Sequence, residues 1–133
     1  MTNRAEDWIA QAGHDLNHAG HALEAGDYDW ACFAAHQAAE KAVKGLFLFL
    51  GGEGWGHVVT RLLKDLVQSR KAKVPEEQIR AALRLDKHYI PTRHPNGFDS
   101  GAPKDYYTAE EARQAIADAQ CIYQFCQQSL REQ

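Results

Sequence analysis

The sequence is poor in the features that mark specialised classes of protein. Its three cysteines, Cys32, Cys121 and Cys126, are an odd and sparse set, which indicates reduced and mostly buried thiols in a cytoplasmic protein. Its most apolar run, residues 46–50, is far too short to cross a membrane, so no membrane partner is expected. The net charge of -3 gives no overall basic footprint for nucleic acid, although it leaves a local basic site open.

Strand-like alternation, internal repeats and low-complexity segments are also missing, and a helical periodicity runs through nearly the whole chain. Apolar residues recur at spacings of three and four, first from Trp8 to Leu23 and then along the later segments. With 133 residues, 44% of them hydrophobic and 25% charged, one globular domain spanning residues 1–133 is expected. The predicted fold is all-α, an antiparallel bundle of about five helices.

The predicted second helix, about residues 28–50, is expected to lie at the centre of this bundle. It is apolar or small around most of its circumference, as a helix with neighbours on several sides must be. One broad face would let a neighbouring backbone approach closely, because it carries only small residues: Ala31, Ala34, Ala35, Ala38, Ala42 and Gly45. Thr108 and Glu111 form a capping box that opens the predicted last helix.

The most informative stretch is residues 85–95, where a helical pattern ends in a dense polar cluster before Pro91. Asp86 falls in the middle of an apolar face, and burying a carboxylate without a partner is unfavourable. Arg93, seven residues on, is the nearest candidate, so the sequence predicts a buried Asp86–Arg93 ion pair. A structural ion pair is the preferred interpretation over a catalytic one. The face in which Asp86 lies is made of Ile79, Ala82, Leu83, Tyr89 and Ile90.

Four segments of the chain follow one another in the order found in a known family. They are residues 27–45, whose alanine-rich helix ends in Gln-Ala-Ala-Glu-Lys-Ala, then Gly56-His57, then residues 85–95 with Tyr-Ile-Pro-Thr-Arg, and then Tyr107-Thr108. In these segments the chain resembles the HEPN domain family, small helical proteins often encoded beside minimal nucleotidyltransferases. The resemblance implies a nucleotide-binding or interaction protein without a cofactor. It also implies a homodimer, and a separate minimal nucleotidyltransferase as partner in a two-gene module, of which toxin–antitoxin pairs are one type.

Many HEPN proteins are metal-independent ribonucleases, and their signature is an arginine followed, after four to six residues, by a histidine. Only three residues separate Arg84 from His88, and Arg93 is followed directly by His94. No arginine of the chain matches the signature, so the resemblance does not carry ribonuclease activity over. Arg84, His88 and Arg93 remain the candidates for an alternative enzyme with a non-standard Arg/His arrangement. At four residues apart, Arg84 and His88 share a helix face, and a solvent-facing pair is the preferred interpretation.

A narrow polar stripe on the 28–50 helix is the candidate ligand site. Gln37, Lys41 and Lys44 recur at four and three residues, with Glu40 beside them. One interpretation is an anion site for a nucleotide phosphate, and the other is a solvated helix edge with a Glu40–Lys44 pair. The predicted ligand-binding residues are Gln37, Lys41, Lys44, Asp86 and Arg93.

Two further groups of side chains are weaker candidates. His14, His18 and His21 share one face of the first predicted helix, where three imidazoles suit a transition metal. No Asp, Glu or Cys spacing completes a site, so an ordinary surface cluster is preferred and no metal is predicted. Trp30, Trp55 and Phe98 are aromatic enough to stack on a base, but a role in the core or in an interface is preferred.

Overall fold

The structure, a computed structural model, describes residues 4–132 and is helical nearly throughout. Within this range there are five α-helices, two short 3-10 helices and no strand, so the predicted all-α bundle is confirmed. The helices are α1 (Ala5–Glu24), α2 (Tyr28–Phe49), α3 (Val59–Arg70), α4 (Glu76–Asp86), η1 (Pro95–Gly97), η2 (Pro103–Asp105) and α5 (Ala109–Arg131). Thr108 and Glu111 cap α5 reciprocally, as predicted.

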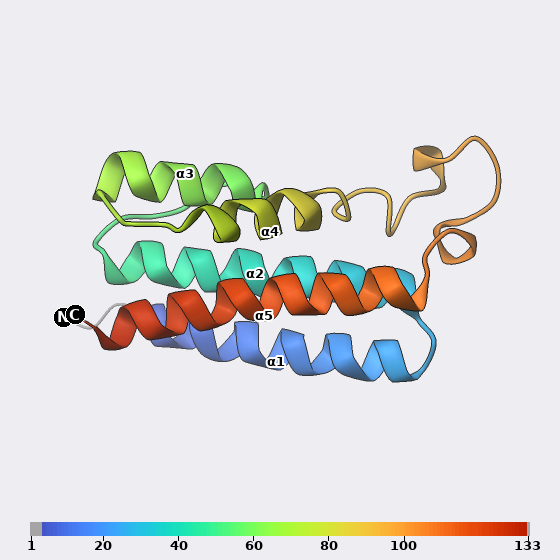
Figure 1. Cartoon of the computed structure of the whole chain (residues 1–133), viewed down its shortest axis with the longest axis horizontal. Helices are drawn as coiled ribbons and strands as arrows, with labels where there is room; N and C mark the ends of the chain where they lie inside the picture. Colours follow the sequence, from blue (N-terminus) through green and yellow to red (C-terminus); the bar gives the residue numbers. More distant parts are fainter. Residues whose placement is uncertain (1–3, 133) are drawn as a thin grey trace.

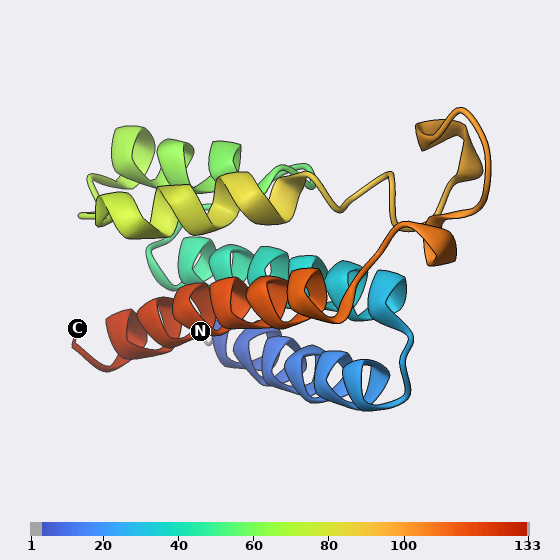
Figure 2. The same ribbon diagram turned by 45° about the vertical axis from the view of Figure 1, so that its right-hand side comes forward.

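The helices form layers around α2, which has neighbours on both sides. The α3–α4 hairpin covers one side, while α1 and α5 cover the other (Figure 1). The same arrangement is visible after a 45° turn, with the long α4–α5 connection projecting beyond one end of the bundle (Figure 2). Most of the residues of α2 are buried, which fits its central place.

Small residues on α2 bring α1 close to it. Ala31, Ala35, Ala38 and Ala42 are fully buried, as the small-residue face predicts. A Cβ atom added at Gly45 would lie 3.0 Å from the backbone oxygen of Ala5, closer than ordinary van der Waals contact. The absence of a side chain at this position therefore sets how closely the two helix backbones pack.

The end of α4 differs from the sequence prediction. The α-helix ends at Asp86, and turns replace it through Arg93. The buried face consists of Gln78, Ala81, Ala82 and Leu85, so the apolar face is rotated from the predicted one. Leu83 and Ile90, expected to point inward, are 50% and 49% exposed. Asp86 does turn inward, but its carboxylate bonds to α2 and α3 and not to Arg93.

No helix in residues 4–132 is both long enough and apolar enough to cross a membrane. The three thiols are unpaired. Cys32 and Cys126 are buried and Cys121 is partly buried, in line with the predicted reduced cysteines. Burial raises the pKa of the Cys32 thiol to about 12, so this group stays protonated.

Candidate functional site

Asp86 joins three helices and is not paired with Arg93. Its carboxylate accepts hydrogen bonds from the backbone N–H groups of Val59 (2.8 Å) and Thr60 (2.9 Å), at the start of α3. It also accepts a bond from Nε2 of the fully buried His36 on α2, at 3.2 Å. Burial alone would raise the pKa of Asp86, but the hydrogen bonds from His36, Thr60 and Val59 outweigh it and lower the pKa. Asp86 therefore caps the start of α3 from the neighbouring α4.

Arg93 packs on aromatic rings. Its guanidinium carbon lies 4.3 Å from the ring centroid of Phe33 and 4.7 Å from that of Tyr89. Its Nε and Nη2 atoms donate to the backbone oxygen of Tyr89. The predicted Asp86–Arg93 ion pair is thus wrong, because each group is held by other partners. Arg93 instead brings positive charge to the Phe33 side of α2.

The candidate catalytic pair Arg84 and His88 is engaged in structural contacts. Arg84 forms a two-pronged ion pair with the buried Asp118 on α5, with N–O distances of 2.9 and 2.8 Å. The hydrogen bond to Asp118 raises the pKa of Arg84, so the guanidinium stays charged. The expected solvent-facing Arg84–His88 pair is therefore not formed, since Arg84 turns to α5.

His88 lies against Tyr107, which precedes α5. Its Nδ1 atom is 3.4 Å from the Tyr107 hydroxyl, and the two ring centroids are 5.5 Å apart. Burial lowers the pKa of His88, so its ring is neutral near pH 7. A neutral ring in this partly buried position is suited to packing against Tyr107, at the end of the α4–α5 connection.

The predicted stripe on α2 divides between two surroundings. Lys44 donates to Glu40 at 2.9 Å, so the Glu40–Lys44 pair of the alternative interpretation is present. Gln37 and Lys41 turn the other way, toward α1, and Lys41 forms an ion pair with Asp15. Only Gln37 and Lys41 of the three thus share a common surface.

That surface contains a hollow with an aromatic wall. The hollow has a volume of about 290 Å³ and lies between α1 and α2. The indole of Trp30 is edge-on to the ring of Phe33, with centroids 6.1 Å apart. Trp30 is half exposed, so it does not take the place in the core that was one of the roles preferred for it. The hollow is lined by Asp15, His18, Trp30, Phe33, Ala34, Gln37 and Lys41.

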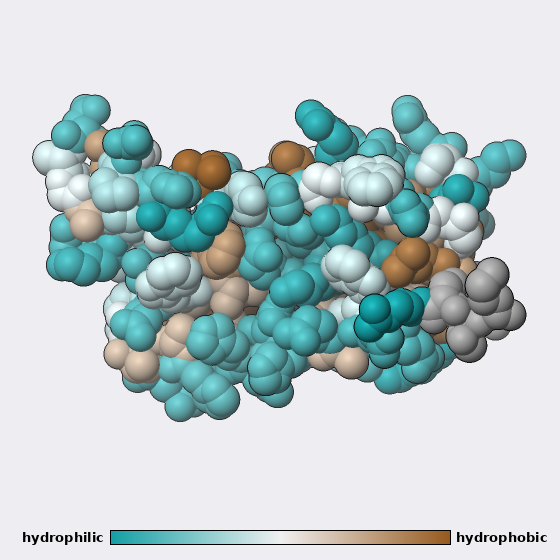
Figure 3. Space-filling view, turned by 180° about the vertical axis from the view of Figure 1, so that it is seen from behind, coloured by the Kyte–Doolittle hydropathy of each residue, from teal (hydrophilic) through white to brown (hydrophobic). Residues whose placement is uncertain are grey.

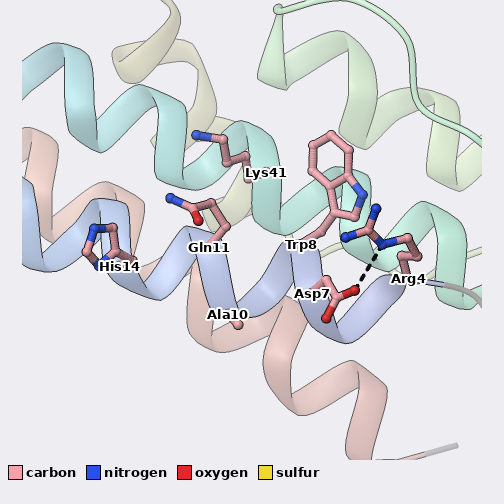
Figure 4. Close-up of a pocket in the computed structure, with 7 residues that line it drawn as sticks. All are labelled: Arg4, Asp7, Trp8, Ala10, Gln11, His14 and Lys41. Carbon is pink, nitrogen blue, oxygen red and sulfur yellow. Dashed lines mark hydrogen bonds and ion pairs between the residues drawn. The ribbon is translucent and has the colours of Figure 1, made fainter.

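A second hollow, of about 680 Å³, adjoins the first at Lys41. Figure 4 shows Lys41 and Gln11 projecting toward it from neighbouring helices, with the Trp8 ring beyond them and His14 at the far end of the α1 face. Arg4 is part of the same wall, where it pairs with Asp7. Lys41 therefore lies at the junction of the two hollows, which together form an open groove along α1 and α2.

The three histidines of α1 do not assemble a metal site. His14 borders the larger hollow and His18 borders the one beside Trp30, while His21 is exposed beyond them. Within residues 4–132, no three His, Cys, Asp or Glu side chains are grouped as a metal ion requires.

One polar group was missed in the sequence. His57, in the loop before α3, places Nδ1 3.1 Å from the buried carboxylate of Glu40. Its ring is stacked on Tyr89 at 5.0 Å, with an angle of 14° between the planes. Gly56-His57 was visible as a segment of the family resemblance, but nothing in the spacing pointed to Glu40, seventeen residues earlier. The contact fixes the loop between α2 and α3.

Comparison with known proteins now decides the family. The family model described as "HEPN domain" matches residues 5–130. The chain belongs to the HEPN domain family. Three similar solved structures cover nearly the whole of both chains, and two of them are described as HEPN proteins.

Among these structures, TT1696 from Thermus thermophilus has a TM-score of 0.91 and 49% identity, and the match covers 96% of this HEPN chain and 98% of its own. ST0689, described as an archaeal HEPN homologue, has a TM-score of 0.82 and 40% identity, and the match covers 97% of this chain and 99% of its own. The HEPN domain protein TM0613 of Thermotoga maritima has a TM-score of 0.76 and 39% identity, and the match covers 94% of this chain and 98% of its own. A Methanocaldococcus jannaschii protein named "Putative toxin MJ1304" is 24% identical over 96% of this chain and 89% of its own.

This HEPN chain is expected not to cleave RNA without a metal. Cleavage through the 2′-hydroxyl needs a base and a cation free to act at the phosphate. Arg84 is held by Asp118, and His88 is packed against Tyr107. The measurement is incubation of the purified protein with single-stranded RNA in chelator, beside His88→Ala. Cleavage by the wild type that is lost in His88→Ala would contradict this expectation.

Proposed function

We propose that this HEPN protein is a nucleotide-binding interaction module that works with a separate minimal nucleotidyltransferase. The family and the toxin name of the M. jannaschii relative support a role in a toxin-type gene pair. The observation that carries the nucleotide site is the half-exposed Trp30 beside Gln37 and Lys41 in one hollow between α1 and α2.

The aromatic wall suits a nucleobase. Stacking on an exposed ring contributes about 1–3 kcal/mol per base and tolerates any base. Phe33 supports Trp30 edge-on, and Arg93 holds the Phe33 ring from another side. Because Trp30 is braced in this way, its exposed surface is a preorganised platform. The amide of Gln37 supplies a donor and an acceptor for a base edge or a ribose hydroxyl.

The phosphate would lie where the two hollows meet. Lys41 provides the positive charge there, and its ion pair with Asp15 fixes the ammonium group at the junction. The larger hollow gives room for phosphate oxygens beside Gln11 and His14 (Figure 4). Asp15 offsets part of the lysine charge, so we expect moderate affinity for a nucleoside monophosphate.

Replacing Trp30 by alanine is expected to weaken AMP binding about tenfold or more, from the loss of one base-stacking contact. Lys41→Gln is expected to weaken AMP more than adenosine, because it removes a charge that only the phosphate uses. The measurement is calorimetric titration of the purified protein. Tyr106→Ala and Lys104→Ala are matched controls, since both residues are exposed in the α4–α5 connection and line neither hollow. Unchanged affinity in Trp30→Ala, or no AMP binding at millimolar concentration, would contradict the proposal.

A further inference from the structure

The charges of the chain are divided unevenly between its layers. Residues 58–94, which comprise α3, α4 and the turns after it, hold nine of the fifteen Lys and Arg but four of the eighteen Asp and Glu. Their net charge is therefore +5, whereas the rest of the chain carries -8. We call residues 58–94 the basic layer. In Figure 1 its two helices lie together on one side of α2.

Most of these cations face the solvent. Asp86 is turned inward to His36, and the charge of Arg84 is neutralised by Asp118. Neither residue therefore changes the net charge of the exposed surface of the layer. The exposed positive side chains of the layer are Arg61, Lys64, Arg70, Lys71, Lys73, Arg80 and Lys87. A positive surface of this kind raises the rate of encounter with an anionic partner.

Exposed apolar side chains lie among the cations of the same layer. Arg80 and Leu83 are exposed on α4, and Lys87 and Ile90 are exposed in the turns that follow it. Trp55 is 77% exposed in the loop that leads into α3. Asp86 bonds to the start of α3, which brings the end of this loop to the end of α4. In Figure 3, small hydrophobic areas lie among hydrophilic ones along the upper edge of the molecule, at the height of α3.

We propose that the basic layer, with Trp55 at its edge, is the docking surface for the protein partner. The partner's matching surface is acidic around an apolar centre that receives Leu83, Ile90 and the Trp55 indole. This inference rests on the proposed function for the existence of that partner, the minimal nucleotidyltransferase. Tryptophan is among the residues that contribute most to binding energy when an interface buries it.

Two other occupants fit the layer less well. A second copy docked symmetrically would place +5 against +5, so a homodimer must use another face. Nucleic acid would gain from the cations, but among the described residues of this surface the Trp55 indole is the one exposed large apolar side chain able to stack on a base, while Leu83 and Ile90 are aliphatic. Aliphatic groups alternating with cations match a protein surface.

The test is co-expression of this chain with the minimal nucleotidyltransferase of the proposed pair, followed by measurement of the affinity between the purified partners. The variants are Trp55→Ala, Leu83→Ala and the double variant Arg80→Glu/Lys87→Glu. We expect each to weaken the complex about tenfold or more, and wild-type affinity to fall as salt rises. Arg113→Glu on α5 and Tyr106→Ala are the matched controls, because both residues are exposed outside the layer.

The outcomes separate the two proposals. If the wild type forms no complex, the partnership itself fails, and this inference fails with it. If the wild type binds and the layer variants bind as tightly as the controls, the docking surface is wrong while the partnership stands. If the layer variants lose binding to a single-stranded RNA probe and keep the protein complex, the layer is a nucleic-acid surface and the inference is overturned.

Discussion

Replacing Asp86 by alanine is expected to lower the free energy of unfolding by about 3 kcal/mol. Loss of a helix cap accounts for about 1 kcal/mol, and loss of the hydrogen bonds to a charged group for about 1.5–3 kcal/mol. The substitution would also leave the His36 ring without a hydrogen-bond partner. Its Nε2 atom bonds to Asp86, and its Nδ1 atom has no hydrogen-bond partner among the described residues. For a chain of this size the thermal midpoint should fall by about 10 °C. Calorimetry or circular dichroism during heating gives this midpoint.

The pH dependence tests the reason for this effect. Because the pKa of Asp86 is lowered in the folded state, its contribution is present above the unfolded pKa of about 3.9 and is lost as pH falls through the folded pKa. The stability advantage of the wild type over Asp86→Asn should therefore be full at pH 7 and shrink below about pH 4. Asp65→Ala, at an exposed site on α3, is the matched control. An unchanged midpoint in Asp86→Ala would show that the three bonds contribute nothing.

Replacing Gly45 by leucine is expected to have a comparable effect, about 3 kcal/mol or more. Its Cβ atom would meet the backbone oxygen of Ala5 at 3.0 Å and side-chain atoms of Ile9 and Trp8 at 3.2 Å. A backbone oxygen cannot swing aside as the end of a side chain can, so α1 must move away from α2. The measurement is chemical denaturation monitored by circular dichroism.

A pair of alanine variants isolates the steric part of that prediction. Glycine inside a helix is less favourable than alanine by about 1 kcal/mol. A Cβ atom added at Gly20, on α1, has nothing within 4 Å, so Gly20→Ala should stabilise the protein by about that amount. Gly45→Ala should show no such gain. If both variants were equally stabilised, the close approach of α1 and α2 would not limit the packing.

Much of the fold could be predicted because its signals are local. The capping box of Thr108 and Glu111 spans four positions, and the small face of α2 repeats with the helical period. The partners of Asp86 could not be predicted in this way. His36 and Val59 are 50 and 27 residues away from it, whereas the predicted partner Arg93 was chosen by its nearness in sequence.

The candidate site was predicted in part for the same reason. Gln37 and Lys41 share a helix face, and the structure adds Trp30 from about two turns earlier on α2. The contribution of α1 comes from the crossing of two helices, which no spacing shows. The basic layer also stayed hidden, because a net charge of -3 averages a +5 layer with a remainder of -8.

The most direct measurement of the central claim is a nuclear magnetic resonance titration of the full chain with AMP. The three tryptophans give three indole N–H signals, which single Trp→Phe variants assign. The account predicts that the Trp30 signal moves with rising AMP while the Trp55 signal stays in place. A Trp30 signal that does not move at millimolar AMP, or a Trp55 signal that moves instead, would contradict a nucleotide site between α1 and α2.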